Sequence, residues 1–240
     1  FCGVRFENPF VLAAAPPSDE LDMVRDAFRA GWAGAVLKTT SVEGTSVPLK
    51  YPMMEGADLG PQRLQALTNI DLISEYHIDE IERRVRALKA EFPNKVVIPS
   101  IMGSKKEEWQ GLVKRLEAAG ADMIECSFSC PQGTLGSKPG FMLGQDPALV
   151  KTVAGWVKEA AVKIPVVIKV TPQVADIVEI AQAVKDAGAD GICASNTIPS
   201  LIGIDLETWR PQPDVEGRSS YGGLSGPAIR PISLRNIAEI

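Results

Sequence analysis

The stretch "LEAAGADMIECSFS" (residues 116–129) decides the fold, because an amphipathic helix ends within it and an apolar strand follows. The same pattern occurs in "FRAGWAGAVLKTT" (28–40) and "VKDAGADGICASNT" (184–197). In all three, an Ala-Gly pair ends the helix, and the apolar run after it is typical of a buried parallel strand. The glycine of each pair fits the left-handed position after a helix, namely Gly31, Gly120 and Gly188.

Three more apolar runs are expected to be strands: "PFVLAAAPP" (9–17), "KVVIPSIM" (95–102) and "IPVVIKVTP" (164–172). Amphipathic segments separate the strands, at 19–30, 77–92, 105–119, 146–162 and 174–187. Ser18 is the expected N-cap of the first helix, whereas Asp146 caps the fourth with Pro147 at its first position. The order predicts six strands alternating with five helices, with a sixth helix beginning near Pro227.

This alternation predicts an α/β protein with a parallel sheet, and we expect a (β/α)8 TIM barrel. The alternative is an open doubly wound sheet, but no G-x-G-x-x-G motif follows the first strand. We expect one domain over residues 1–240. Because "LRNIAEI" reads as the middle of a helix, we expect this barrel to lack its last one or two β/α units.

Composition excludes several classes of function. The net charge is −5 and basic residues are scattered, which argues against a nucleic-acid-binding face. No apolar run approaches the length of a membrane span, and the N-terminus does not resemble a signal peptide. The chain has four cysteines, no C-x-x-C pair and one histidine, so neither a metal site nor an iron–sulfur site is expected. These features favour a reduced, cytoplasmic protein.

Polar residues gather at the carboxyl ends of the expected strands, where β/α barrels carry their active sites. Lys38 and Lys169 end apolar strands, which suggests an anionic or electron-rich ligand or, equally, pairing with neighbouring carboxylates. "SNT" (195–197) suits recognition of a ring with amide-like edges, and it also fits an ordinary turn. "YGGLSGPAIRP" (221–231) reads as a glycine-rich loop before a helix, a pattern that can hold a phosphate.

Cys130 follows a buried strand, precedes Pro131 and opens a glycine-containing loop at 131–145. Such a loop suits a lid over a substrate, and a thiol on it could deliver or remove a proton. Cys126 and Cys193 lie within apolar segments that are predicted to be strands, and both are expected in the core.

These residues carry a family resemblance over nearly all of the chain. "SFSCPQG…LGQDPALV" resembles the active-site loop of the FMN-binding barrel of dihydropyrimidine dehydrogenases, which is similar in turn to class 1 dihydroorotate dehydrogenases. The supporting segments occur in the family's order and are "NPFVLAAAPPS", "AGWAGAVLKT", "LTNIDLISE", "FPNKVVIPSIM", "VVIKVTPQVADIV", "ASNTI" and "SYGGLSGPAIRPISLR".

The resemblance implies an FMN-dependent oxidoreductase that reduces or oxidises the C5–C6 bond of a pyrimidine base such as uracil or thymine. Flavin N5 would exchange a hydride with one ring carbon, and Cys130 would act as the general acid at the other. Three alternatives remain: oxidation of dihydroorotate, a Schiff-base lyase or aldolase that uses Lys169, and a degenerate barrel retained for assembly.

The resemblance also assigns binding residues. Lys169 matches the lysine near flavin N1 and O2, and Lys38 matches the other lysine beside the flavin. The remaining positions expected at the cofactor are Ala14, Thr39, Ser100, Ser225 and Gly226. Those expected at the pyrimidine are Asn69, Asp71, Ser127, Asn196 and Thr197.

Two of these positions depart from the family pattern, since Ser127 replaces an asparagine and Asp71 a glutamate. Both changes shorten a polar side chain next to the ring, so the ring could be bulkier or a water could fill the gap. The resemblance further implies iron–sulfur clusters, FAD and NAD(P)H on a partner chain or another domain. An oligomer is therefore expected.

Overall fold

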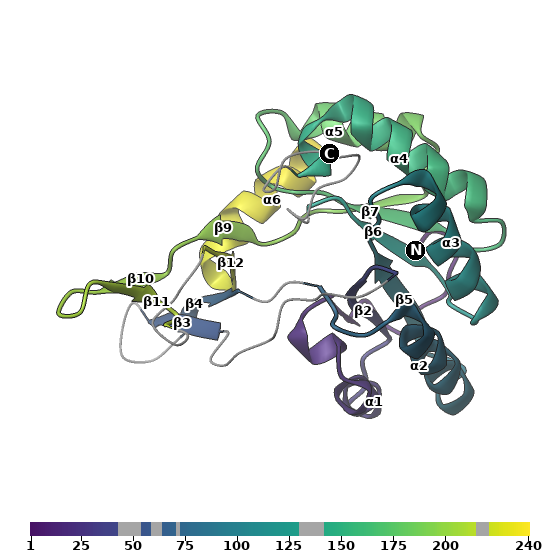
Figure 1. Cartoon of the computed structure of the whole chain (residues 1–240), viewed down its shortest axis with the longest axis horizontal. Coiled ribbons are helices and arrows are strands. Elements are labelled where there is room, and N and C mark those ends of the chain that lie inside the picture. Colours follow the sequence, from purple (N-terminus) through teal and green to yellow (C-terminus); the bar gives the residue numbers. More distant parts are fainter. Residues whose placement is uncertain (43–53, 59–63, 71–72, 130–141, 215–220) are drawn as a thin grey trace.

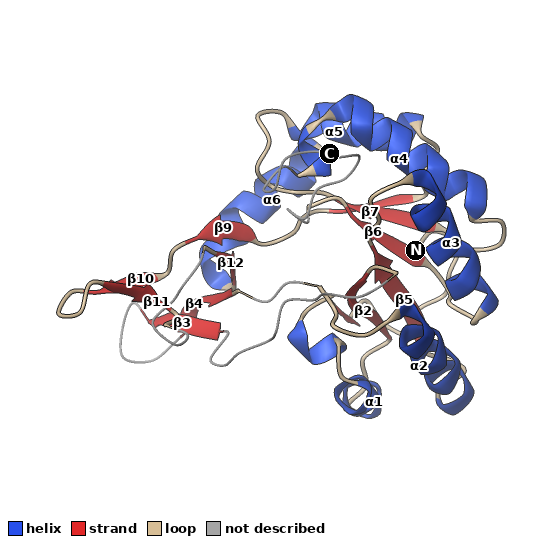
Figure 2. Cartoon of the chain, viewed as in Figure 1, coloured by secondary structure: helices blue, strands red, loops and turns tan. Residues whose placement is uncertain are grey.

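A curved parallel sheet, covered on its outer side by helices, dominates the molecule (Figures 1 and 2). The computed structural model describes residues 1–42, 54–58, 64–70, 73–129, 142–214 and 221–240. A smaller antiparallel sheet lies on the open side of the curve, next to the C-terminal helix (Figure 2).

The strands of the large sheet lie side by side in the same order as they occur in the chain. In the described residues its parallel strands are, in spatial order, β1 (Val11–Leu12), β2 (Gly34–Thr40), β5 (Val96–Ile101), β6 (Ile124–Ser127), β7 (Val166–Lys169) and β8 (Gly191–Cys193). The helices between them are α1 (Leu21–Arg29), α2 (Ile78–Glu91), α3 (Lys106–Ala118), α4 (Pro147–Ala160) and α5 (Ile177–Asp186). A doubly wound sheet reverses its order at a switch point. This sheet does not reverse, so the predicted barrel architecture is confirmed.

Most helix ends match the sequence expectation. Gly31, Gly120 and Gly188 have φ of +101°, +96° and +79°, the left-handed conformation that glycine adopts without strain. Asp146 caps α4 by accepting hydrogen bonds from the amides of Ala148 and Leu149 at 2.9 and 3.1 Å.

The predicted cap of the first helix is wrong. Ser18 belongs to a short 3₁₀ turn, η1 (Pro16–Ser18), and its hydroxyl donates to the carbonyl of Ala15 at 2.9 Å. Helix α1 begins only after Glu20, which makes no side-chain cap. The paired prolines before Ser18 favour this turn, because their fixed φ suits a 3₁₀ start.

Side chains alternate between the two faces of the large sheet and so create two apolar layers. The outer layer packs strands against helices and holds most of the buried residues. The inner layer fills the barrel interior and consists of Val36, Val96, Ile98, Met123 and Val167, with the N-terminal segment packed against it. By the same alternation, Ser100, Ser127 and Lys169 continue the inner face toward the carboxyl ends of their strands.

Trp109 of α3 anchors the outer layer, and we predict that Trp109→Ala lowers the free energy of unfolding by about 3–5 kcal/mol. Its side chain is fully buried and meets the ring of Phe128 edge-on at 5.7 Å. Its indole N–H has no hydrogen-bond partner among the described residues, so Trp109→Phe should cost less than half as much. Chemical denaturation measures both variants. Equal losses for alanine and phenylalanine would contradict this account.

The smaller sheet was not expected from the sequence. In the described residues its antiparallel order is β3 (Met54–Asp58), β4 (Leu64–Asn69), β12 (Gly222–Ser225) and β9 (Ile198–Ser200). A hairpin of β10 (Gly203–Asp205) and β11 (Arg210–Gln212) extends from it (Figure 1). The glycine-rich start of the segment 221–231, which was predicted as a loop, therefore forms strand β12. It continues into the turn η3 (Pro227–Ile229) and helix α6 (Arg230–Glu239).

None of the helices in the described ranges combines the length and the apolar character needed to cross a membrane.

Candidate active site

The carboxyl ends of the large sheet bury two lysines. Lys38 on β2 is 7% exposed and Lys169 on β7 is 8% exposed. Lys38 lies where the pairing of β2 with β5 shifts its register. Lys169 pairs with Ser127 on one side and with Cys193 on the other. The predicted placement of both lysines at buried strand ends is thus correct.

Hydroxyl groups line the same end of the sheet. Thr39 and Ser100 share a hydrogen bond of 2.9 Å between their side-chain oxygens, so these two predicted residues are brought together. Ser127 is buried beside Lys169 in the strand register. Ala14 is half-buried and packs against the inner apolar layer.

Sequence reasoning missed Glu125, which lies on the inner face of β6 two residues before Ser127. The residue is 3% exposed, and its Oε1 lies 3.9 Å from Nζ of Lys169. Within the part of the chain that the structure describes, that oxygen has no hydrogen-bond partner. The sequence did contain a signal for Glu125, namely an acidic residue within the otherwise apolar strand sequence "DMIECS". Acidic residues are seldom buried unless they are paired.

The thiols of Cys126 and Cys193 are held in the protonated form by their surroundings. Burial, followed by the charge of Glu125, raises the pKa of Cys193 to about 12. The same two causes raise the pKa of Cys126 well above its ordinary value. Reactive thiols need a lowered pKa, so both residues fit the structural role expected for them.

The segment after β8 carries Asn196 and Thr197 back to the large sheet. The amide N–H of Asn196 donates to the carbonyl of Val170 at 2.9 Å. Its side-chain Nδ2 donates to the hydroxyl of Ser129 at 2.5 Å. Asn196 therefore lies against the residue that directly precedes Cys130.

Phe128 and Gly144, which lie on either side of the segment 130–141 in the chain, are close together. The amide of Gly144 donates to the carbonyl of Phe128 at 2.7 Å. A side chain at Gly144 would lie 2.8 Å from that carbonyl oxygen, so glycine allows the close approach. Cys130 and Asp71 themselves lie outside the described residues, and their predicted roles remain predictions.

The small sheet brings together Asn69 and Thr197, which are far apart in the chain. Gly223 on β12 pairs with Asn69 on β4, and its Cα approaches Thr197 so closely that a methyl group there would collide with the threonine side chain. Ser225 donates its hydroxyl to the carbonyl of Leu67 at 3.2 Å. Gly226 follows with φ of +89°, just before η3 and α6.

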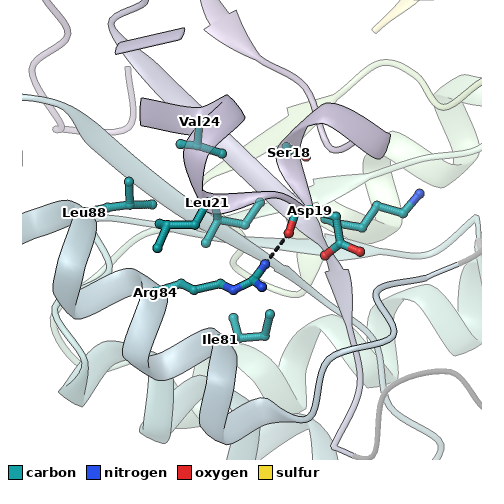
Figure 3. Close-up of a pocket in the computed structure, with 9 residues that line it drawn as sticks. Ser18, Asp19, Leu21, Val24, Ile81, Arg84 and Leu88 are labelled. Atoms are coloured by element: carbon teal, nitrogen blue, oxygen red, sulfur yellow. Dashed lines mark hydrogen bonds between the residues drawn. The ribbon is translucent and has the colours of Figure 1, made fainter. Parts of the chain in front are cut away.

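The turn after β1 packs against α2, and Figure 3 shows the side chains at this contact. Arg84 donates to the carbonyl of Asp19 and to Glu80, and its guanidinium lies 3.7 Å from the ring centre of Tyr76. Ser74 links the same turn to β2, because its hydroxyl bonds Asp19 at 2.6 Å and its amide bonds the carbonyl of Thr39 at 2.8 Å.

The cavity in Figure 3 measures about 10 Å³. This is room for about one water molecule. The arrangement around Arg84 therefore packs the turn after β1 closely against α2.

Known proteins resemble the chain over its whole length. It is 39% identical to the Escherichia coli NAD-dependent dihydropyrimidine dehydrogenase subunit PreA, across the whole chain and 57% of that protein. It is 36% identical to the chloroplastic dihydropyrimidine dehydrogenase (NADP(+)) of Arabidopsis thaliana, across 99% of the chain and 57% of that protein. It is 35% identical to the catalytic subunit of dihydroorotate dehydrogenase B (NAD(+)) of Pyrococcus horikoshii, across 99% of the chain and 72% of that protein.

The chain thus spans little more than half the length of the first two relatives. Among solved structures, the carboxyl transferase domain of Rhizobium etli pyruvate carboxylase matches 77% of this chain and 26% of its own, at 16% identity and a TM-score of 0.45, a likeness too weak to support any argument. The family profile described as dihydroorotate dehydrogenase matches residues 1–240. Its full coverage, together with the parallel barrel strands, shows that this chain belongs to the dihydroorotate dehydrogenase family.

Proposed function

We propose that this chain is the FMN-binding, catalytic part of an oxidoreductase that reduces or oxidises the C5–C6 bond of a pyrimidine base. The observation that carries the proposal is the burial of Lys38 and Lys169 at the carboxyl ends of the barrel strands. Two ammonium groups make this end of the barrel electropositive, and Glu125 offsets part of the charge of Lys169. A flavin ring that gathers negative charge on reduction suits such an end.

The described residues fit this cofactor. The barrel end offers two cations and a hydroxyl pair, Thr39 and Ser100, which can bond the polar edge of the flavin ring. Gly226 and Ala228 carry backbone N–H groups at the start of η3 that suit a phosphate, whereas those of Ile229 and Arg230 are bonded within the turn. Lys169 would stabilise negative charge at the N1 and O2 edge. When bound, FMN supplies hydride exchange with a carbon of the substrate.

Cys130 is the proposed proton donor in reduction and the proton acceptor in oxidation. Its neighbour Ser129 is buried and bonded to Asn196, which supports a position near the barrel end. A thiol whose pKa lies near the working pH can donate a proton in one direction and accept it in the other. The thiols of Cys126 and Cys193 are poorer candidates, because burial raises the pKa of both.

Amide and hydroxyl groups are proposed to bind the pyrimidine. Its edge alternates acceptors with a donor, which Asn69, Asn196 and Thr197 can satisfy. Ser127 and Asp71 would complete this set. Because both have short side chains, we propose that the site has room for a substituted ring or for a bridging water.

The electron partner is proposed to be a module that carries NAD(P)H, FAD and iron–sulfur clusters. Support comes from two relatives, a subunit of an NAD-dependent dihydropyrimidine dehydrogenase and the catalytic subunit of dihydroorotate dehydrogenase B (NAD(+)). A purified protein that reduced a pyrimidine with NAD(P)H, and carried FMN as its single cofactor, would contradict this part.

The central experiment is a titration of the visible spectrum with candidate substrates. The purified protein should be yellow, and dihydrouracil or dihydrothymine should bleach it. With an artificial electron carrier, uracil and thymine should turn over faster than dihydroorotate. Faster turnover of dihydroorotate would favour the second candidate activity, that of the 35% identical relative. A colourless protein that gains no flavin on reconstitution would disprove the proposal.

Gly223→Ala should raise the KM for the pyrimidine by about tenfold or more, because about 1.4 kcal/mol of lost binding energy gives a factor of ten. The added methyl group would lie 2.9 Å from Cβ of Thr197 and would force the threonine side chain to move. Steady-state kinetics with the artificial carrier measures this change.

A matched control is Gly155→Ala in the middle of α4, where an added methyl group meets no described atom within 4 Å outside its own helix turn. This variant should keep its KM and gain stability, since alanine is the better helix former. An unchanged KM in Gly223→Ala would remove the small sheet from the substrate site.

A further inference from the structure

We propose that Glu125 is a positioning residue that holds the ammonium group of Lys169 at the cofactor edge from inside the barrel. The inference rests on the proposed function, because the cation it positions is the one assigned to the flavin. Glu125 lies one inward-facing layer below Lys169, on the neighbouring strand, with 3.9 Å between Oε1 and Nζ.

The distance defines the kind of contact. At 3.9 Å the two groups form an ion pair but not a hydrogen bond. The carboxylate therefore attracts the ammonium group without occupying its three N–H donors. Those donors are left for a partner at the open end of the barrel, which is where the flavin is proposed to bind.

Burying the charges of Glu125 and Lys169 costs free energy, so the presence of the pair needs an explanation. Glu125 is 3% exposed and Lys169 is 8% exposed, and Oε1 of Glu125 lacks a hydrogen-bond partner in the described ranges. Buried ion pairs are weak stabilisers, and well-packed apolar residues often replace them without loss of stability. An unsatisfied buried oxygen adds a further cost. Stability therefore does not account for the pair, whereas a charge held in place for chemistry does.

Among the residues on the strands next to Lys169, Glu125 supplies the negative charge that faces its ammonium group. On β8 the paired residue is Cys193, whose raised pKa keeps it neutral. On β6 the paired residue is Ser127, which is uncharged. β5 contributes Ser100, directly opposite Glu125.

A double-mutant cycle on the full-length, flavin-free protein tests the pair, using Glu125→Gln, Lys169→Met and the combination. Each single change leaves one buried charge without its partner and should lower the melting temperature by roughly 5–15 °C. The combination removes both charges, and its loss should be smaller than the sum of the two. Strictly additive losses would overturn the inference.

Flavin affinity is the second readout, measured by fluorescence titration of the apoprotein with FMN. Glu125→Gln should weaken binding about tenfold in the wild-type background and less than twofold beside Lys169→Met. Equal weakening in both backgrounds would mean that Glu125 does not act through Lys169. Glu125→Asp keeps the charge and should recover at least half of the affinity. If Glu125→Gln alone fails to fold, its combination with Lys169→Met decides: a combination that folds supports the pair, and one that also fails to fold would overturn it.

A matched control is Cys126→Ser, the next residue on β6, whose side chain faces the helices. It should lower the melting temperature equally in both backgrounds and leave FMN affinity unchanged. If the wild-type protein binds no FMN, the proposed function fails, but the melting cycle still decides whether Glu125 holds Lys169.

Discussion

Replacing Cys130 with alanine is expected to lower turnover by roughly 10²–10⁴-fold, the range that positioned proton transfer contributes, while FMN stays bound. The change removes the group that would deliver a proton to the ring carbon adjacent to the one that exchanges the hydride. Stopped-flow reduction of the bound flavin by a dihydropyrimidine measures the loss directly, and the flavin spectrum reports retention of the cofactor.

The matched control is Cys126→Ala, four residues earlier in the chain. That thiol is fully buried and its pKa is raised by burial. The control should lower stability and leave the rate of flavin reduction within about twofold of wild type. A Cys130→Ala protein that kept near wild-type rates would exclude the cysteine as the proton donor. Such a result would leave the family membership of the chain unaffected.

Lys169→Met is expected to slow flavin reduction by about 10²–10³-fold, which is the usual effect of removing one preorganised charge from an active site. The substitution takes away the cation that would face the negative charge of reduced flavin. The midpoint potential of bound FMN should fall, because its reduced form loses stabilisation. Potentiometric titration gives the potential, and stopped-flow spectroscopy gives the rate.

Lys151→Met on α4 serves as the control for loss of a lysine, since Lys151 is exposed and pairs with Asp186 on α5 at 3.3 Å, on the outer side of the helices. Its potential and rate should match those of wild type. An unchanged potential in Lys169→Met would place the lysine away from the flavin. Borohydride trapping of a substrate on Lys169, in a colourless protein, would instead support the lyase alternative.

Much of the large sheet could be predicted because its signals are local. Each Ala-Gly helix end requires a left-handed residue, and the φ angles of Gly31, Gly120 and Gly188 confirm it. Strand ends mark the active side of a barrel, so the order of apolar runs was enough to assign Lys38, Ser100 and Lys169 to one end. Asp146 was predictable as a cap because its side chain meets the next helical amides.

The small sheet could not be predicted. Its strands are short, and β12 is rich in glycine, so they lack the alternating pattern that identifies a strand. Pairing of Gly223 with Asn69 also joins residues more than 150 positions apart in the chain, and nothing local selects that partner. Ser18 failed as a cap for a different, local reason, because the prolines before it favoured a tight turn over a helix start.

The sequence by itself determined the alternation of strands and helices, the places where helices end, and the set of polar residues at the strand ends. These depend on neighbours within a few residues. Only the tertiary structure decided that Asn69 and Thr197 flank Gly223, and that Glu125 lies 3.9 Å from Lys169. Such contacts depend on strand register and on closure of distant segments, because side chains from different strands meet only after the sheets have assembled.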